Sequence, residues 1–115
     1  MDNDVTVVDE KKGEVLVLNV GGRLDAASSP IIEKSVFEFI DAGNRKIVLN
    51  FSGVAYLSSA GMRLLLSSTK RLKSLEGNIV VCCLSDMVMD VIKMAGFDHI
   101  LNIQASEDEA LKVFE

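Results

Sequence analysis

The stretch KIVLNFSGVAYLSSAGMR, residues 46–63, decides the fold of this chain. Its first six residues, Lys46 to Phe51, are mostly apolar, as expected for a buried strand. The serines near its end open a helix expected from Ser59 to Leu75, which Gly77 terminates. The expected inward stripe of that helix is Met62, Leu65, Leu66, Thr69 and Leu72. A buried strand that leads directly into an amphipathic helix predicts an α/β protein.

Strands and helices alternate outward from this stretch. Val5–Val8 and Glu14–Val20 are expected to pair as an antiparallel hairpin around Lys11-Lys12-Gly13, with Gly21-Gly22 closing the second strand. The further elements expected are a helix from a Ser28 cap and Pro30 to Gly43, a strand Asn78–Leu84, a helix Ser85–Met94, a strand Ile100–Ile103, and a helix from Ser106 to Phe114. The order predicts one α/β domain over residues 1–115, with about four helices on a mixed sheet of about five strands. Its N-terminal hairpin is antiparallel and the remainder mainly parallel.

The composition restricts the classes of function. Apolar residues make up 49% of the 115 residues, enough for one aliphatic core. The net charge of -5 argues against binding to nucleic acid or to anionic lipid, since both need a basic face. Met1 to Glu10 is acidic and lacks the apolar run of a signal peptide. No apolar run approaches the roughly 20 residues of a membrane span.

The sulfur-containing side chains are expected in the core. Cys82 and Cys83 follow an apolar run, and neighbouring strand residues point to opposite faces, so a bond between them is not expected. No metal-ligand spacing surrounds them, and the lack of a disulfide framework suits a reducing compartment. The same interpretation places Met87, Met89 and Met94 in core packing.

Catalytic machinery is not apparent in the sequence. The chain has one histidine, His99, with no cysteine or serine partner in a recognisable arrangement. It contains no nucleophile elbow and no glycine-rich phosphate loop of the known patterns. We therefore expect that the protein is not an enzyme and needs no cofactor or metal.

Two serines at the start of the second helix are the best candidates for a functional site. Helix capping alone is enough to explain a serine at position 58 or 59, since serine is a preferred N-cap residue. The alternative is phosphorylation, because the unpaired N–H groups and positive dipole of a helix N-terminus accommodate a phosphoryl group. Such a group adds about two negative charges to the surface.

Three motifs in this order resemble the STAS domain (sulfate transporter and anti-sigma factor antagonist) in its small stand-alone bacterial form. Gly22-Arg23-Leu24-Asp25-Ala26 resembles its G-x-L-D-x motif. Lys46 to Val54 is similar to its central strand and turn, and Tyr56 to Met62 to its x-x-D-S-[SAT]-G-[LM] motif. The resemblance covers nearly the whole chain.

The resemblance implies partner switching in the bacterial cytoplasm. The unphosphorylated antagonist binds an anti-sigma factor, which is also a serine kinase. That kinase phosphorylates the antagonist with ATP and releases it, and a PP2C-type phosphatase resets it. The phosphoacceptor falls on Ser59, with Ser58 as the runner-up. The partner-binding residues implied are Asp25, Ser58, Ser59, Ala60, Gly61, Met62 and Arg63.

Two positions differ from the family pattern. Ser58 stands where the family has Asp before the acceptor, and Asn50 replaces the usual Asp of the central strand. The first difference favours an alternative function, a non-phosphorylated interaction or scaffold subunit of a signalling or lipid-transport complex. Gly61 is explained either by close packing of the helix start or by a partner's approach. Nucleotide binding is a weaker alternative.

Overall fold

The computed structural model describes residues 5–115. Within them, five strands form one sheet in the order β1-β2-β3-β4-β5. The β1–β2 pair is antiparallel and the other three pairs are parallel, which confirms the α/β fold with a mixed sheet. The elements along the chain are β1 Thr6–Lys12, β2 Val15–Leu24, α1 Ser29–Asp41, β3 Lys46–Leu57, α2 Ser59–Ser74, β4 Asn78–Cys82, α3 Asp86–Met94, the 3₁₀ turn η1 Phe97–His99, β5 Asn102–Gln104 and α4 Glu107–Lys112.

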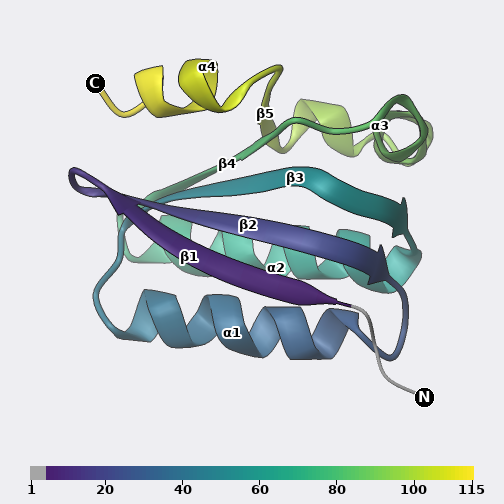
Figure 1. Ribbon diagram of the computed structural model, residues 1–115, viewed down its shortest axis with the longest axis horizontal. Helices are drawn as coiled ribbons and strands as arrows, with labels where there is room; N and C mark the ends of the chain where they lie inside the picture. The colour runs from purple at the N-terminus through teal and green to yellow at the C-terminus, as the bar shows by residue number, and fades with distance from the viewer. Residues whose placement is uncertain (1–4) are drawn as a thin grey trace.

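The helices cover both faces of the sheet. α1 and α2 run side by side along one face, and α4 lies on the opposite side (Figure 1). Residues alternate between the two faces along each strand. Leu16 and Leu18 of β2 join a large aliphatic core with α1, α2 and α3. Val15 and Val17 join a small core that is closed by Ala110 of α4.

The strands β2 and β3 are longer than the sequence suggested. Gly21-Gly22 was expected to close β2, and Phe51 to close the strand now seen as β3; both expectations are wrong. The two strands stay paired as far as Leu24 and Leu57, across two register irregularities. A Cβ atom at Gly53 would lie 3.2 Å from Gly21 Cα, so glycine permits a close approach of the strands here instead of ending them.

The start of α1 also differs from expectation. Ser28 occupies the N-cap position, but its hydroxyl makes no cap hydrogen bond, and Pro30 is the second helical residue. The Ser28 hydroxyl instead accepts from the Asp25 amide (3.0 Å) and donates to the carbonyl of Arg23. It therefore closes the β2–α1 loop, a role that short-range sequence pattern does not separate from capping.

The inward stripe of α2 begins one residue earlier than expected. Leu65 and Leu72 are buried as predicted, whereas Met62, Leu66 and Thr69 are only half-buried. The other buried residues of α2 are Gly61, Leu64 and Ser68. The shift arises because α2 packs against α1 as well as against the sheet. The half-buried Met62, Leu66 and Thr69 lie on the side of α2 that faces away from α1.

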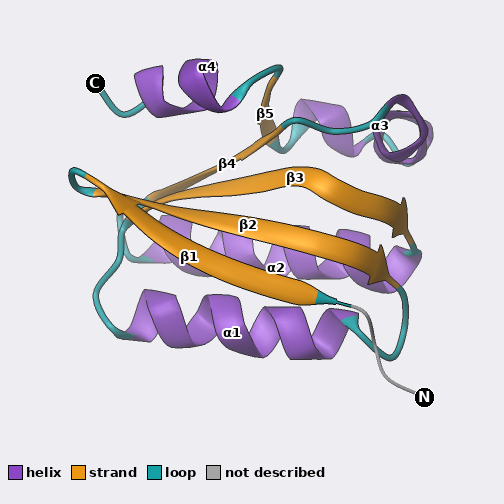
Figure 2. Ribbon diagram, viewed as in Figure 1, coloured by secondary structure: helices purple, strands orange, loops and turns teal. Residues whose placement is uncertain are grey.

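The C-terminal third contains two further corrections. Met87 and Met94 are 62% and 87% exposed, so the expectation that they belong to the core is wrong; α3 buries only Val88 and Ile92. The expected strand Ile100–Ile103 is present, but it starts and ends later, as the short β5 Asn102–Gln104 (Figure 2), because Ile100 caps the η1 turn that precedes it. These short elements at the edge of the sheet carry too few residues for a clear periodicity.

The cysteines do not follow the strand geometry expected of them. β4 ends at Cys82, and Cys83 adopts a positive φ of 66° outside the strand. The two free sulfur atoms consequently lie 3.1 Å apart, so the expectation that they face opposite sides is wrong. Burial is the main reason that the pKa of the Cys82 thiol lies far above its usual range.

No helix in residues 5–115 has both the length and the apolar character required to cross a membrane. The expectation about the N-terminal segment falls partly outside this range, since Met1 to Asp4 are not among the described residues.

Candidate functional site

The two candidate serines occupy different environments at the β3–α2 junction. Ser58 is the N-cap of α2, and its hydroxyl accepts from the Gly61 amide at 3.3 Å. The same hydroxyl donates to the carbonyl of Leu24 at 2.8 Å, and the Ser58 amide donates to that carbonyl at 2.9 Å. Ser58 therefore joins the end of β2 to the start of α2, and its oxygen is fully engaged within the fold.

Ser59 is the first residue of α2 and is exposed. Its hydroxyl makes no hydrogen bond with any of residues 5–115, and the amides of Ser59 and Ala60 likewise have no acceptor there. These amides belong to the group of donors that every helix N-terminus leaves unpaired. An exposed hydroxyl beside free donors and the positive end of a 16-residue helix is a suitable position for a phosphoryl group.

Gly61 is buried against the end of β2. A Cβ atom at this position would contact Leu57 Cδ1 and would lie 3.1 Å from Leu24 Cβ and 3.2 Å from the Leu24 carbonyl oxygen. Of the two explanations for this glycine, the structure favours close packing of the helix start, because its backbone faces the core.

Asp25 lies in the neighbouring β2–α1 loop, immediately after the residue to which Ser58 is bonded. Its carboxylate accepts from the amides of Ser28 (2.9 Å) and Ala27 (3.0 Å). The bond from the Ser28 amide, followed by the contact with the Ser28 hydroxyl, holds the pKa of Asp25 below its usual range. The half-buried Asp25 thus remains a carboxylate that orders the loop next to Ser59.

Side chains of α2 from Ser59 onward border a groove. Met62 and Leu66, with Phe97 of η1 and Ala95, enclose a hollow of about 270 Å³ that begins at Ser59. A second hollow of about 510 Å³ continues along α2 past Leu66 to Ile100, which is 59% exposed. Ser59, Ala60, Met62 and Arg63, together with Asp25, form what we call the α2 surface.

Sequence reasoning missed several neighbours of this surface. The Arg23 guanidinium stacks over the Tyr56 ring at 4.3 Å from its centroid, because these residues are register partners across β2 and β3. Phe97 and Ile100 reach the groove from η1 and its C-terminal end. Arg23 and Tyr56 lie within the quoted motifs, but only the strand register pairs them. Phe97 and Ile100 lie outside those motifs, and the η1 turn brings them to the groove.

Asn50 lies on the other side of the sheet, within β3. Its amide nitrogen donates to Glu107 Oε1 at 2.9 Å, and its oxygen accepts from the Ser52 amide at 2.9 Å. Glu107 also accepts from Lys12 Nζ at 2.5 Å. The bond from Lys12, then that from Asn50, holds the pKa of Glu107 below its usual range. An aspartate at position 50 would oppose this carboxylate, whereas Asn50 donates to it.

The residues described offer no grouping of three or more metal-ligating side chains. His99 is exposed at the end of η1, and its Nε2 lies 3.9 Å from the carboxylate of Asp98. The molecule is thus a small α/β protein in which the loops after β2 and β3 form one surface at the start of α2.

Comparison with known proteins agrees with this architecture. Residues 6–110 match the model of the STAS domain, and the chain therefore belongs to the STAS domain family. BtrV of Bordetella bronchiseptica, named as an anti-sigma factor antagonist, is 29% identical over 106 residues, which cover 92% of this chain and 91% of BtrV. The anti-sigma-B factor antagonist of Staphylococcus aureus is 26% identical over 101 residues, covering 88% of this chain and 91% of the relative.

Solved structures show the same fold. An anti-sigma factor antagonist from Mycobacterium paratuberculosis superposes with a TM-score of 0.89 at 22% identity, covering 98% of this chain and 96% of that one. The unphosphorylated form of the anti-sigma factor antagonist SpoIIAA gives a TM-score of 0.79 at 23% identity, covering 95% of this chain and 96% of SpoIIAA. At these identities the likeness concerns the fold.

Proposed function

We propose that this chain is an anti-sigma factor antagonist that binds an anti-sigma factor through the α2 surface and is released when Ser59 is phosphorylated. The names of the relatives BtrV and the Staphylococcus aureus protein support the antagonist assignment. The partner in this proposal is an anti-sigma factor that also acts as the serine kinase. A PP2C-type phosphatase reverses the modification, and the cycle takes place in the cytoplasm with no catalysis by this chain.

The contrast between the two serines carries the proposal. Ser59 presents an exposed hydroxyl with no partner in residues 5–115, whereas the hydroxyl of Ser58 is engaged by Gly61 and Leu24. A kinase can approach Ser59 without opening the fold, while phosphorylation of Ser58 would break the cap of α2. A phosphoryl group on Ser59 would place about two negative charges within the surface that the partner contacts.

The replacement of the family's Asp by Ser58 is compatible with this function. Serine and aspartate are similarly good N-cap residues, because the oxygen of either accepts from the first-turn amides. Ser58 retains this role through the Gly61 amide. The replacement removes a negative charge next to the acceptor but leaves the geometry that presents Ser59.

Phosphorylation by the cognate anti-sigma factor kinase tests the proposal. The wild-type chain, Ser59→Ala and Ser58→Ala are incubated with the kinase and ATP, and the products are mapped by tandem mass spectrometry. We expect one phosphate on Ser59 in the wild type and in Ser58→Ala, and none in Ser59→Ala. Phosphate on Ser58, or an unmodified wild-type chain, would contradict the proposal.

A second candidate function is constitutive binding to a partner without a switch, which the missing charge at Ser58 favours. Ser59→Asp separates the two functions when binding to the anti-sigma factor is measured by calorimetry. Ser74→Asp is the matched control, since it makes the same change about 22 Å away at the other end of α2. We expect weaker binding for Ser59→Asp alone; equal affinities would favour constitutive binding.

A further inference from the structure

Arg63 lies one turn after Ser59 on α2. Residues four apart on a helix are neighbours on its surface, and Ser59 and Arg63 line the same hollow. Arg63 is exposed, and its guanidinium has no ion pair with any carboxylate in residues 5–115. An unpaired cation therefore accompanies the free amides of Ser59 and Ala60.

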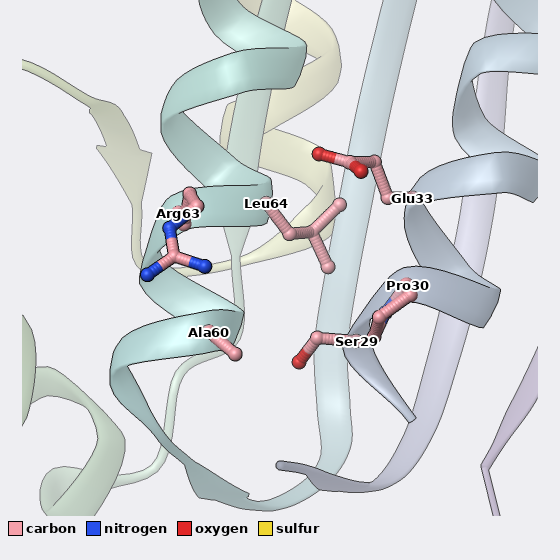
Figure 3. Close-up of a pocket in the computed structure, with 6 residues that line it drawn as sticks. All are labelled: Ser29, Pro30, Glu33, Ala60, Arg63 and Leu64. Atoms are coloured by element: carbon pink, nitrogen blue, oxygen red, sulfur yellow. The ribbon is translucent and has the colours of Figure 1, made fainter. Parts of the chain in front are cut away.

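Ser29 provides an independent indication of a binding site in the adjoining pocket, which shares Arg63 with the hollow at Ser59 and includes the next residue, Ala60. Ser29 is only 2% exposed, and its hydroxyl has no hydrogen-bond partner among residues 5–115. Buried hydroxyls are seldom left unpaired, since desolvation without a bond is unfavourable. Figure 3 shows the hydroxyl pointing from α1 toward Ala60, across a pocket of about 60 Å³ that Arg63 also lines.

The donors at this pocket come from α2 and from Ser29, and not from the backbone of α1. The Ser29 amide donates to Asp25, the Ile31 amide donates to Ser28, and Pro30 has no amide hydrogen. Glu33 is the one carboxylate among the residues lining the pocket. It accepts from the Ser67 hydroxyl at 2.6 Å, one turn further along α2 and away from the free amides.

We propose that Arg63, the free amides at the start of α2 and the Ser29 hydroxyl form a binding site for a phosphate dianion, which the phosphoryl group on Ser59 fills within the same chain. This inference rests on the proposed function, since it assumes that Ser59 carries the phosphate. Arg63 would bind the phosphoryl oxygens as a charge-assisted pair, and Ser29 would gain its missing acceptor. Phosphorylation would then withdraw Arg63 from the α2 surface as well as adding negative charge.

Phosphoserine placed at position 59 by genetic code expansion tests the site without any kinase. The pKa of the phosphate monoester is measured by ³¹P NMR titration in the otherwise wild-type chain, Arg63→Gln, Ser29→Ala and Lys70→Gln. Removal of a bound cation raises this pKa, because the dianion loses stabilisation. Lys70 is the matched control, since it is an exposed cation of the same helix and lies about 10 Å further from Ser59 than Arg63 does.

We expect the phosphoserine pKa to be higher by roughly 0.15–0.4 in Arg63→Gln, from the usual strength of such helix pairs. We expect a rise in Ser29→Ala and no change in Lys70→Gln. An unchanged pKa in Arg63→Gln or in Ser29→Ala, or an equal rise in Lys70→Gln, would overturn the site. Amide NMR spectra confirm that each variant is folded. Failure of the kinase to modify Ser59 would refute the proposed function separately.

Titration with inorganic phosphate shows whether the site takes phosphate from solution or from phosphoserine at position 59. It is titrated into the unmodified and the phosphoserine chains while the amide signals of Ala60 and Arg63 are followed. Saturable shifts that occur in the unmodified chain and disappear in the phosphoserine chain support the proposal. Shifts that persist in the phosphoserine chain would show that the site takes phosphate from solution, and would overturn it.

Discussion

Replacement of Ser58 by alanine should destabilise the fold, whereas the same change at Ser59 should not. Loss of the N-cap bond to the Gly61 amide costs about 1 kcal/mol. Loss of the bond to the Leu24 carbonyl, which is part-buried, adds roughly another 1 kcal/mol. The sum of about 2 kcal/mol is a large fraction of the stability of a typical domain, which is about 5–15 kcal/mol.

Urea denaturation followed by circular dichroism measures this difference. With a slope of roughly 1–3 kcal/mol/M, Ser58→Ala should lower the midpoint by about 1 M. Ser59→Ala removes an exposed hydroxyl with no partner in the described chain, and should stay within about 0.5 kcal/mol of the wild type. Equal midpoints for the two variants would refute the division of roles between the serines.

Three further predictions follow from the packing and the charges. Gly61→Ala should destabilise the fold by about 1–3 kcal/mol in urea denaturation despite alanine's helix preference, because its Cβ would meet Leu24; a more stable variant would contradict this. The lowered pKa of Glu107 stabilises the fold above the carboxyl's unfolded pKa, and this contribution is lost as pH falls through the folded pKa. In urea denaturation at a series of acid pH values, Glu107→Gln should therefore lose less free energy of unfolding than the wild type; an equal loss would contradict this. Iodoacetamide should modify half-buried Cys83 before buried Cys82, as peptide mass spectrometry would show; the reverse order would be inconsistent with this burial.

The sequence was sufficient for the order of elements, because their apolar periodicity is set locally. The extents of β2 and β3 were not predictable in the same way. Gly21 and Gly53 resemble strand terminators in isolation, and only their mutual approach shows that they keep the two strands paired. The exposure of Met87 likewise depends on how little of α3 the sheet covers.

The candidate site was predictable in part. The family pattern directed attention to Ser59 and Asp25. In the structure Ser59 is the first residue of α2, and Asp25 lies in the neighbouring β2–α1 loop, directly after the residue to which Ser58 is bonded. Only the hydrogen bonds seen in the structure distinguish the roles of Ser58 and Ser59, because either serine suits a helix start in sequence. The role proposed for Ser29 could not have been found from sequence. It depends on a buried hydroxyl that lacks a hydrogen-bond partner in residues 5–115 and that shares a pocket with residues of α2.

The most direct test of the proposed switch is the affinity of the cognate anti-sigma factor for the unmodified chain and for the chain with phosphoserine encoded at position 59. Calorimetry under identical salt conditions gives both dissociation constants. We predict tight binding of the unmodified chain and at least a tenfold loss, about 1.4 kcal/mol, with phosphoserine, because the phosphate alters the charge of the α2 surface. Equal affinities for the two forms would contradict the switch at Ser59.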